Sequence, residues 1–369
     1  MIRFLKSFIF FLRLLVVKKY VDVILYAPQH FNRGKDGSNE YFRAIIDALE
    51  SNNISYISFD EPDYITRSKN NKDGIPFDFM YLVILILRRL YSTEMNCIVK
   101  DQKVGSFLSK TFLRNLKFKN YIVLSQSMLS VFRGINNNAK LFDLQHGIIH
   151  SDKETYIDKG VASSNILVNQ VNLLLYGRGF KNLLCVNEKS DYFSSNTFVI
   201  GSQNKKLSYS FEDNKNILVS LQFTNDHSVK QNSMLKKELE QLIITNSSFN
   251  FYLKDHPRFN NEVSMSGFFQ YDNVFKAKED LFSNFSLCSL HLTAYSTTTF
   301  ECAEFGIPTI FLESLKNEFD MFEKDFKYPF NATLSDAFQN YEKYSNEVIK
   351  WRKEFYSDFN EQKFISLLK

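Results

Sequence analysis

The stretch Leu292–Pro308 reads LTAYSTTTFECAEFGIP and carries a strand end followed by a short helix. The apolar run Leu287–Leu292 predicts a buried strand, and four hydroxyl residues follow it from Ser296 onward. A helix is predicted to begin near Thr299 and to end at Gly306, just before the next apolar run. A strand, a helix and a second strand in this order favour parallel pairing and an α/β fold.

The same order of elements recurs on both sides of that stretch. Helical spacing of apolar residues predicts helices at Asn39–Ser51 and Ser233–Thr245. Short apolar runs predict further strands at Asp22–Ala27, Ile54–Phe59, Asn120–Leu124, Lys140–Leu144, Leu183–Val186, Thr197–Ile200, Asn216–Ser220, Phe249–Leu253, Asn273–Phe275 and Thr309–Leu312. Two successive α/β sets predict two Rossmann-like domains facing one cleft, with ligands beyond the carboxyl ends of the strands.

The length of the chain sets the number of domains. Its 369 residues exceed what one hydrophobic core usually supports, so two domains are expected. Residues 202–215 are polar, lack apolar periodicity and are predicted to link them. The N-terminal domain is then 1–201, the C-terminal domain 216–335, and residues 336–369 are predicted to form closing helices.

Charge and cysteine usage narrow the class of protein. The formal net charge is +4, with Lys and Arg scattered among nearly as many acids. A nucleic-acid binder would gather that charge in a patch, so no nucleic-acid partner is expected. Cys97, Cys185, Cys288 and Cys302 show no CxxC spacing and lie in apolar stretches that look buried. Free thiols in a reducing, cytoplasmic compartment are therefore expected.

The N-terminal segment 1–20, MIRFLKSFIFFLRLLVVKKY, is apolar with basic residues at both ends. Arg13 divides it, which argues against a membrane span, and it lacks the small-residue cleavage site of a signal peptide. The pattern suits a helix lying in the membrane interface, held by its apolar side chains and by anionic lipid. A first helix packed on the domain is the alternative. The apolar stretch Phe79–Leu87, followed by Arg88 and Arg89, predicts either an extension of that surface or a buried helix.

The hydroxyl run at Ser296 is the strongest candidate binding element. Backbone N–H groups at a helix start, together with Ser296, Thr297, Thr298 and Thr299, would form an anion site. Glu301 in the first helical turn is placed to accept hydrogen bonds from hydroxyls such as those of a ribose. The alternative is helix capping alone, since Thr298 and Glu301 have capping-box spacing. Four hydroxyl residues exceed what a cap needs.

A second candidate element directly follows the strand Phe249–Leu253. Lys254, His256 and Arg258 could neutralise phosphate charge, while Pro257 stiffens the loop. A histidine can also protonate a leaving phosphate oxygen. An ordinary surface loop is the alternative.

A third element, Gln145-His146-Gly147, follows the strand Lys140–Leu144. Gly147 would permit a tight turn that leaves the His146 imidazole exposed at a strand end, as a general base requires. A hydrogen-bonded structural histidine is the alternative. His30, in the loop after the first strand, could line the acceptor side of the cleft or be a solvated loop residue.

Several motifs are absent from the sequence. There is no DxD pair for a metal–nucleotide complex, so no metal ion or other cofactor is expected. P-loop, GxGxxG, GxSxG and HExxH motifs are also missing, which argues against several common enzyme classes.

Together these elements carry a resemblance. A strand followed by His256-Pro257, then a Ser/Thr cluster with Glu301 and a downstream Gly306-x-Pro308, resembles bacterial GT-B enzymes of capsule and lipopolysaccharide synthesis. These are the sialyltransferase and polysialyltransferase, capsule Kdo transferase and teichoic-acid glycerophosphotransferase groups. The sialyltransferase-like groups usually carry an acidic pair before the glycine, where this chain has Gln145-His146. That departure argues against a sialic-acid donor.

The resemblance implies an activity and a location, which is the cytoplasmic face of the bacterial inner membrane. The enzyme would move a sugar from a nucleotide-activated donor, CMP- or CDP-linked rather than UDP-linked, to a polysaccharide or lipid-linked acceptor, with inversion and without metal. By analogy, Lys254, Pro257, Arg258 and Thr299 belong to the donor side, His256 and Ser296–Thr298 hold the phosphate, and Glu301 holds the ribose or base. His146 would be the base, beside His30, Gln145 and Gly147 on the acceptor side.

Three other functions stay open. A CDP-polyol phosphotransferase would use the same donor site, and a nucleotide-sugar epimerase would use the same fold. A non-catalytic, membrane-associated assembly protein could also retain this fold.

Overall fold

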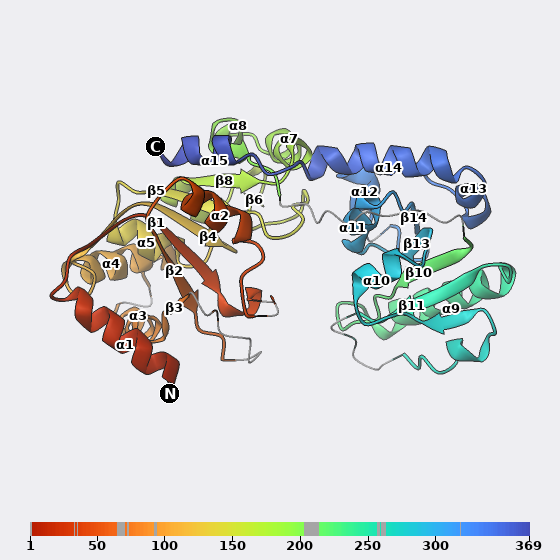
Figure 1. The fold of residues 1–369 in the computed structure, drawn as a ribbon, viewed down its shortest axis with the longest axis horizontal. Coiled ribbons are helices and arrows are strands. Elements are labelled where there is room, and N and C mark those ends of the chain that lie inside the picture. Colours follow the sequence, from red (N-terminus) through yellow and green to blue (C-terminus); the bar gives the residue numbers. More distant parts are fainter. Residues whose placement is uncertain are drawn as a thin grey trace. The chain divides into compact units, whose positions relative to one another are not determined.

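The computed structural model describes residues 2–32, 34, 36–64, 71, 74–91, 94–202, 214–256, 259, 263–317 and 319–369. It divides into two compact units (Figure 1). Unit 1 comprises Met1–Asn204 with Tyr356–Lys369, and unit 2 comprises Lys205–Phe355. Each unit is built on its own parallel sheet, which confirms the predicted α/β class with two Rossmann-like domains. Their arrangement about a cleft stays a prediction.

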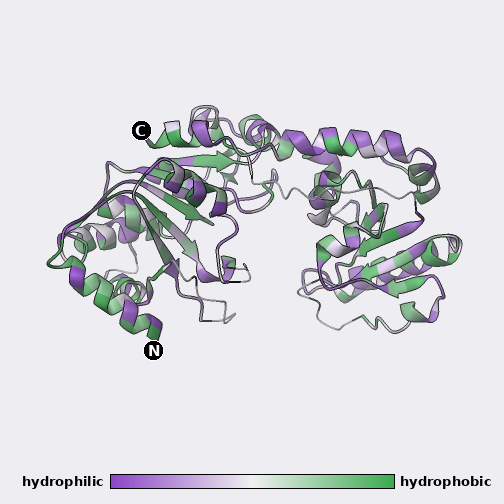
Figure 2. Ribbon diagram, viewed as in Figure 1, coloured by the Kyte–Doolittle hydropathy of each residue, from purple (hydrophilic) through white to green (hydrophobic). Residues whose placement is uncertain are grey.

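Unit 1 contains a parallel seven-stranded sheet in the order β3-β2-β1-β4-β5-β8-β9. The strands are β1 (Lys19–Pro28), β2 (Tyr56–Glu61), β3 (Ile75–Pro76), β4 (Leu116–Leu124), β5 (Lys140–Leu144), β8 (Val171–Leu175) and β9 (Thr197–Val199). A small antiparallel pair, β6 (Ile157–Asp158) and β7 (Val161–Ala162), follows β5. The strands are mostly apolar, as Figure 2 shows, because helices cover the sheet and exclude water.

The helical segments of unit 1 are α1 (Ile2–Leu14), η1 (Gln29–Phe31), α2 (Arg43–Ser51), α3 (Asp78–Leu90), α4 (Cys97–Lys110), α5 (Leu129–Ile135), α6 (Ser164–Asn169), α7 (Arg178–Asn187), α8 (Tyr192–Asn196) and α15 (Glu361–Leu368). The last helix, α15, buries Phe364, Ile365 and Leu368 in the same core as the β1 residues Val23 and Leu25. The end of the chain is therefore part of unit 1.

Unit 2 contains a parallel five-stranded sheet in the order β12-β11-β10-β13-β14. The strands are β10 (Asn216–Ser220), β11 (Asn250–Lys254), β12 (Val274–Lys276), β13 (Leu290–Thr293) and β14 (Thr309–Phe311). The helical segments are α9 (Val229–Thr245), η2 (Phe268–Gln270), α10 (Leu281–Phe285), α11 (Thr298–Glu304), α12 (Met321–Lys324), α13 (Leu334–Gln339) and α14 (Tyr341–Phe355).

Helix α14 fixes the position of α11, the helix that follows the hydroxyl run. The Trp351 ring stacks on Phe300 at 4.7 Å between centroids. The guanidinium of Arg352 donates from Nε to the Phe300 carbonyl at 3.1 Å and pairs with Glu304 at 2.8 Å. The predicted C-terminal helices thus belong to different units, with α13 and α14 in unit 2 and α15 in unit 1.

Two sequence expectations are wrong. Leu183–Val186 lies in helix α7 rather than in a strand, because Phe180, Leu183 and Leu184 recur at helical spacing and bury one face. The strand position is taken by β8, which the sequence reading missed. Cys97 is exposed at the start of α4, whereas Cys288 and Cys302 are buried as expected.

Both sheets share a strand order that reverses beside the first strand of each unit. In unit 1 the chain goes outward from β1 to β3 and returns to β4 on the other side. In unit 2 it goes from β10 to β12 and returns to β13. The crevice beyond the carboxyl ends at such a reversal is where open parallel sheets bind ligands.

Candidate functional site

The hydroxyl run of unit 2 lies at the carboxyl end of β13, at this reversal. Helix α11 begins at Thr298 with Thr297 as its N-cap, and the Thr297 side chain makes no capping hydrogen bond. The capping box considered for Thr298 and Glu301 is therefore not formed. Instead the Ser296 Oγ accepts from the Thr298 amide at 3.2 Å and donates to the Thr298 Oγ1 at 3.0 Å. Thr297 is exposed.

The residues that follow differ in what they can offer a ligand. Thr299 is fully buried, so its hydroxyl does not reach the surface, and its amide donates to the Ser296 carbonyl at 3.1 Å. A donor-binding role for the Thr299 side chain therefore has no support in its position. Glu301 is half-buried in the first turn of α11.

Gln222, two residues beyond β10, holds the turn that carries the hydroxyl run. Its Oε1 accepts from the Tyr295 amide at 2.7 Å and from the Thr293 hydroxyl at 3.1 Å. The Thr293 Oγ1 in turn accepts from the Ser296 amide at 3.3 Å. The sequence reading did not select Gln222, although a polar residue just beyond a buried strand was the available signal.

An aromatic group adjoins the hydroxyl run. The Tyr295 ring stacks on Phe319 at 4.0 Å, and the Tyr295 hydroxyl bonds to His227 Nε2. The other ring nitrogen of His227 contacts Asn232 Oδ1 at 3.2 Å, so this buried histidine fixes the tyrosine.

A cavity of about 270 Å³ opens beside Ala294 at the carboxyl ends of β13 and β14. Aromatic and charged side chains share its wall, which includes Phe311, Phe319, Phe322, Tyr328, Phe330, Glu313, Lys316, Asp320 and Glu323. No sequence motif marks this cavity, because its wall residues are spread along the chain from Ala294 to Asn331.

Lys254 ends β11 and His256 follows it, on the side of β10 that faces away from β13. The register places Lys254 opposite Ser220, and Ser220 opposite Thr293, in one row across the sheet. At about 5 Å between strands, the ends of β11 and β13 are roughly 10 Å apart. The Lys254 ammonium donates to the Glu279 carbonyl at 2.7 Å, toward the β12 side. His256 is half-buried. Pro257 and Arg258 lie outside the described residues.

In unit 1 the structure brings His30 and His146 together. His30 follows β1 and is exposed, whereas His146 follows β5 and is half-buried. Both imidazoles contact the ring of Phe31, at 4.2 Å and 5.1 Å between centroids. Burial is the main cause that lowers the pKa of His146 to about 4, with the nearby Lys153 charge adding to it. His146 is therefore neutral at physiological pH and able to accept a proton.

Gln145 and Gly147 flank His146 in the chain, and their acceptor-side role stays a prediction. Gln145 is buried, and its Oε1 accepts from the Tyr176 amide at 2.9 Å while its Nε2 donates to the Gly147 carbonyl at 2.8 Å. It positions the segment that carries His146. Gly147 does not need glycine for a tight turn, since its φ is not positive. A Cβ there would meet no residue other than its chain neighbours within 4 Å, so there is open space beside Gly147.

A buried carboxyl lies behind His146 at the end of β5. Asp143 accepts from the Tyr156 hydroxyl at 3.0 Å and from the Gln126 amide at 3.0 Å. Burial raises the pKa of Asp143 to about 7, although these hydrogen bonds and the Lys153 charge act in the opposite direction. Burial also lowers the pKa of Lys153. Neither Asp143 nor Lys153 was selected from the sequence.

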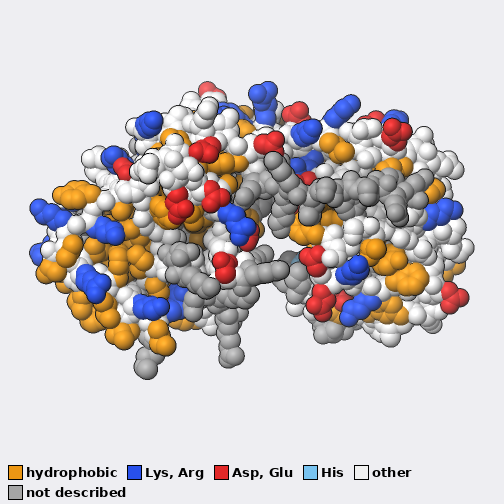
Figure 3. Space-filling model, in the orientation of Figure 1, with side chains coloured by type: hydrophobic (Ala, Val, Ile, Leu, Met, Phe, Trp, Pro, Cys, Tyr) orange, Lys and Arg blue, Asp and Glu red, His pale blue; other side chains and the backbone are white. Residues whose placement is uncertain are grey.

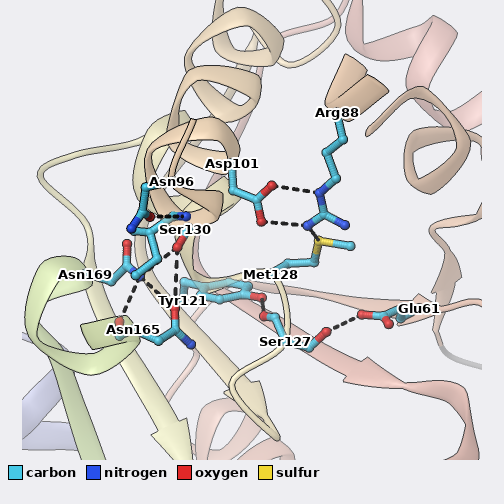
Figure 4. A network of polar contacts seen from close by, with 11 residues as sticks. Glu61, Arg88, Asn96, Asp101, Tyr121, Ser127, Met128, Ser130, Asn165 and Asn169 are labelled. Atoms are coloured by element: carbon cyan, nitrogen blue, oxygen red, sulfur yellow. Dashed lines mark hydrogen bonds and ion pairs between the residues drawn. The ribbon is translucent and has the colours of Figure 1, made fainter. Parts of the chain in front are cut away.

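The turn after β4 has unusual backbone geometry. Ser125, Gln126 and Met128 all have positive φ, between 54° and 60°, which non-glycine residues seldom adopt. Side-chain hydrogen bonds hold this turn (Figure 4). The Tyr121 hydroxyl donates to the Ser127 carbonyl, and the Ser127 Oγ donates to the Glu61 carboxylate. Backbone strain that is held in this way concentrates at functional sites. The turn lies at the reversal between β1 and β4, and sequence reading assigned it no role.

Within the described ranges, no group of three or more His, Cys, Asp or Glu residues gathers to hold a metal ion. No helix in the same ranges is long and apolar enough to cross a membrane.

Comparison of the sequence with known proteins gave no match to any protein-family model and none to a curated protein. The fold, in contrast, matches solved structures over nearly its whole length. The wall teichoic acid polymerase TagF, as its H444N variant, aligns at 12% identity over 95% of this chain and 89% of that one, with a TM-score of 0.54. The UDP-GlcNAc 2-epimerase from Methanocaldococcus jannaschii aligns at 14% identity over 95% and 99%, with a TM-score of 0.52.

The UDP-GlcNAc 2-epimerase from Neisseria meningitidis, bound to UDP-GlcNAc, aligns at 11% identity over 95% and 99% of the two chains, with a TM-score of 0.52. At these identities the likeness is one of fold. This chain has the two-domain GT-B-type fold, as the sequence predicted.

Proposed function

We propose that the chain is a glycosyltransferase that takes a sugar from a nucleotide-activated donor and passes it to a polysaccharide or lipid-linked glycan of the bacterial surface. The observation that carries this proposal is the hydroxyl run of unit 2. Its exposed Thr297 and half-buried Ser296 lie at the reversal between β10 and β13 without a capping role for the Thr297 side chain.

On the donor side, the nucleotide phosphate would bind at Ser296 and Thr297, where hydroxyl and amide groups are fixed by Gln222 and Thr293. The aromatic rings of the cavity beside Ala294 offer a surface for the flat face of the base, since aromatic side chains can stack on any base. Fixed donors of this kind stabilise the negative charge that develops on a departing nucleotide. Glu301 and His256 remain candidates for contacts to the ribose and the leaving phosphate.

On the acceptor side, His146 would act as the general base. Its Nδ1 is buried without a hydrogen-bond partner, so we give the proton transfer to Nε2. Nε2 would take the proton of the acceptor hydroxyl as that oxygen bonds to the anomeric carbon. The bond from that carbon to the phosphate oxygen breaks at the same time, and the nucleotide leaves with the electron pair. This direct displacement inverts the anomeric centre and involves only residues of the chain.

The choice of nucleotide is a proposal from the resemblance, which favours CMP- or CDP-linked donors. A CDP-polyol phosphotransferase is the second candidate, because the fold is shared with the teichoic acid polymerase TagF. An epimerase is a third candidate, because two UDP-GlcNAc 2-epimerases share the fold equally well.

Thermal-shift measurements with CMP, CDP, UDP and GDP test the donor site. We expect stabilisation by at least one nucleotide, and a loss of at least tenfold in its affinity in the variant Ser296→Ala/Thr297→Ala, because each hydrogen bond to a charged group contributes about 1.5–3 kcal/mol. The variant Ser247→Ala/Ser248→Ala is the matched control. Its two exposed hydroxyls precede β11 and so lie at the opposite, amino edge of the same sheet.

Product analysis then separates the candidates. Transfer of a sugar to an acceptor glycan supports the proposal, and transfer of a polyol phosphate supports the second candidate. Conversion of UDP-GlcNAc to its epimer with no acceptor present would contradict the proposal. A chain that no nucleotide stabilises would be a non-catalytic protein of this fold.

A further inference from the structure

Helix α1 is apolar on two opposite faces. One face packs on unit 1 through Ser7, Phe11 and Leu14, all of them buried. The Phe11 ring lies 5.5 Å from Phe77 and 5.8 Å from Phe59. The packed-helix reading of the N-terminus is therefore right for this face.

Arg3 ties the start of the same helix to the unit. Its guanidinium lies 3.0 Å from the Asp78 carboxylate and 4.0 Å from that of Asp60. Arg3 is thus an internal ion-pair partner and is set apart from the basic residues that remain on the surface.

The opposite face of α1 is apolar and exposed. Ile2, Leu5, Ile9 and Leu12 recur at intervals of three or four residues, which aligns them along one side of a helix. Their exposed fractions run from 42% to 72%. Val16 and Val17, in the turn that follows, are exposed at 80% and 58%. A surface helix of a water-soluble domain normally turns polar residues to this side.

Helix α3 extends the exposed apolar face. Phe79 of α3 packs edge-on against Phe4 and Phe8 of α1, at 5.9 Å and 5.1 Å between centroids. While Met80 and Ile84 are buried, Leu82, Leu85, Ile86 and Leu90 are exposed. Figure 3 shows hydrophobic side chains gathered over this part of unit 1. We call the exposed residues of α1, its following turn and α3 the apolar face.

The apolar face is concentrated and its borders are basic. Of the 23 large hydrophobic side chains that are exposed in the described ranges, 12 lie on residues 2–20 and α3. Lys6, Arg13 and Arg89 are exposed beside them, and Lys18 and Lys19 follow. Residues 1–21 contain no Asp or Glu, and the one acid of α3 is the buried Asp78.

We propose that the apolar face binds the surface of an anionic lipid bilayer, with α1 and α3 lying in the interface. Leu and Ile side chains would enter the acyl boundary while Lys and Arg side chains meet phosphate groups, which is the pattern of interfacial helices. Unlike a second protein copy, an anionic surface also accounts for the absence of acids. Helix α1 has 13 residues and a length of about 20 Å, so it lies on the bilayer without crossing it.

Co-sedimentation of the full chain with lipid vesicles tests the proposal. One set of vesicles contains phosphatidylcholine alone, and the other an equal mixture with phosphatidylglycerol. We expect binding to the anionic mixture and at least tenfold weaker binding to phosphatidylcholine. Ile9→Glu/Leu12→Glu should weaken binding to the mixture at least tenfold, and Lys6→Gln/Arg13→Gln about fivefold for each charge removed.

The control for the acidic variant is Val168→Glu/Val186→Glu, because both valines are exposed on unit 1 outside the apolar face. All changed side chains are on the surface, and a circular dichroism melt checks that each variant folds. The proposal would be overturned if the wild-type chain bound neither kind of vesicle. A wild-type dimer, seen by light scattering, that Ile9→Glu/Leu12→Glu converts to a monomer without any effect on vesicle binding would also overturn it. Neither outcome bears on nucleotide binding by unit 2.

Discussion

The two units share a hydrogen-bond arrangement at the carboxyl edge of their sheets, but different groups there are available to a ligand. A buried glutamine just beyond a strand accepts a hydrogen bond from the amide of the tyrosine that follows a neighbouring strand. In unit 1 this pair is Gln145 and Tyr176, and in unit 2 it is Gln222 and Tyr295. The glutamine fixes the edge in both cases, so the neighbouring residues decide its chemistry.

In unit 2 those neighbours are hydroxyls that never titrate in the physiological range, next to an aromatic cavity. In unit 1 they are titratable groups in a poorly solvated setting, namely a neutral His146 and a buried Asp143. Hydroxyls and amides suit the binding of a fixed phosphate charge, whereas a neutral imidazole can accept a proton. Under the proposed function, unit 2 would bind the phosphate and unit 1 would take the proton.

The largest expected effect comes from His146→Ala. Removal of a general base lowers turnover by about 10²–10⁴-fold, and we expect kcat to fall in that range with the melting temperature little changed. His30→Ala is the control, because His30 also contacts Phe31 but is exposed. We expect it to change kcat by less than about tenfold. A folded His146→Ala variant with the wild-type rate would remove the proton-transfer role from unit 1.

The lowered pKa of His146 predicts how kcat/KM depends on pH. Its pKa in the folded protein is lowered to about 4, so the imidazole stays neutral and able to accept a proton above that pH. We expect the contribution of His146 to kcat/KM to stay flat from pH 8 to about pH 5 and to fall toward pH 4. A fall centred near pH 6.5, the ordinary value for histidine, would show that His146 is more solvated than the structure indicates.

The glutamine pair predicts an intermediate effect on stability. Gln222→Ala and Gln145→Ala each leave a partly buried edge amide without its acceptor, which costs about 1–3 kcal/mol of unfolding free energy. Chemical denaturation would measure both. We also expect Gln222→Ala to weaken nucleotide binding and Gln145→Ala to leave it unchanged, because only Gln222 supports the hydroxyl run. Equal losses of nucleotide affinity in the two variants would contradict the proposal that only unit 2 binds the nucleotide.

Two glycines predict the smallest effects, and in opposite directions. Gly306 has φ of +68°, and a Cβ there would lie 2.4 Å from Ser345 Oγ, so Gly306→Ala should destabilise the protein by about 1–2 kcal/mol. Gly147→Ala should be neutral or should stabilise by up to about 1 kcal/mol, since its Cβ meets open space.

If the acceptor occupies the open space beside Gly147, Gly147→Ala should raise the acceptor KM and leave the melting temperature unchanged. An unchanged KM would mean that the acceptor stays away from Gly147.

Strand and helix placement followed closely from the sequence in unit 2. Its strands were predicted within about three residues, because each is a short apolar run followed at once by polar residues. Unit 1 was harder. The run Leu183–Val186 satisfies a strand pattern locally, and only the packing of Phe180 with Leu183 and Leu184 makes it a helix. Periodicity cannot separate a short buried strand from a short buried helix.

Local pattern and chain connectivity were enough to predict the α/β class, two domains and the position of the hydroxyl run. Which residues are available to a ligand depends on tertiary packing. It buried the Thr299 hydroxyl, gave Gln145 a bracing role and brought His30 to His146. It also left α1 apolar on two opposite faces. Availability depends on contacts between residues far apart in the chain, and no local pattern records which of them will meet.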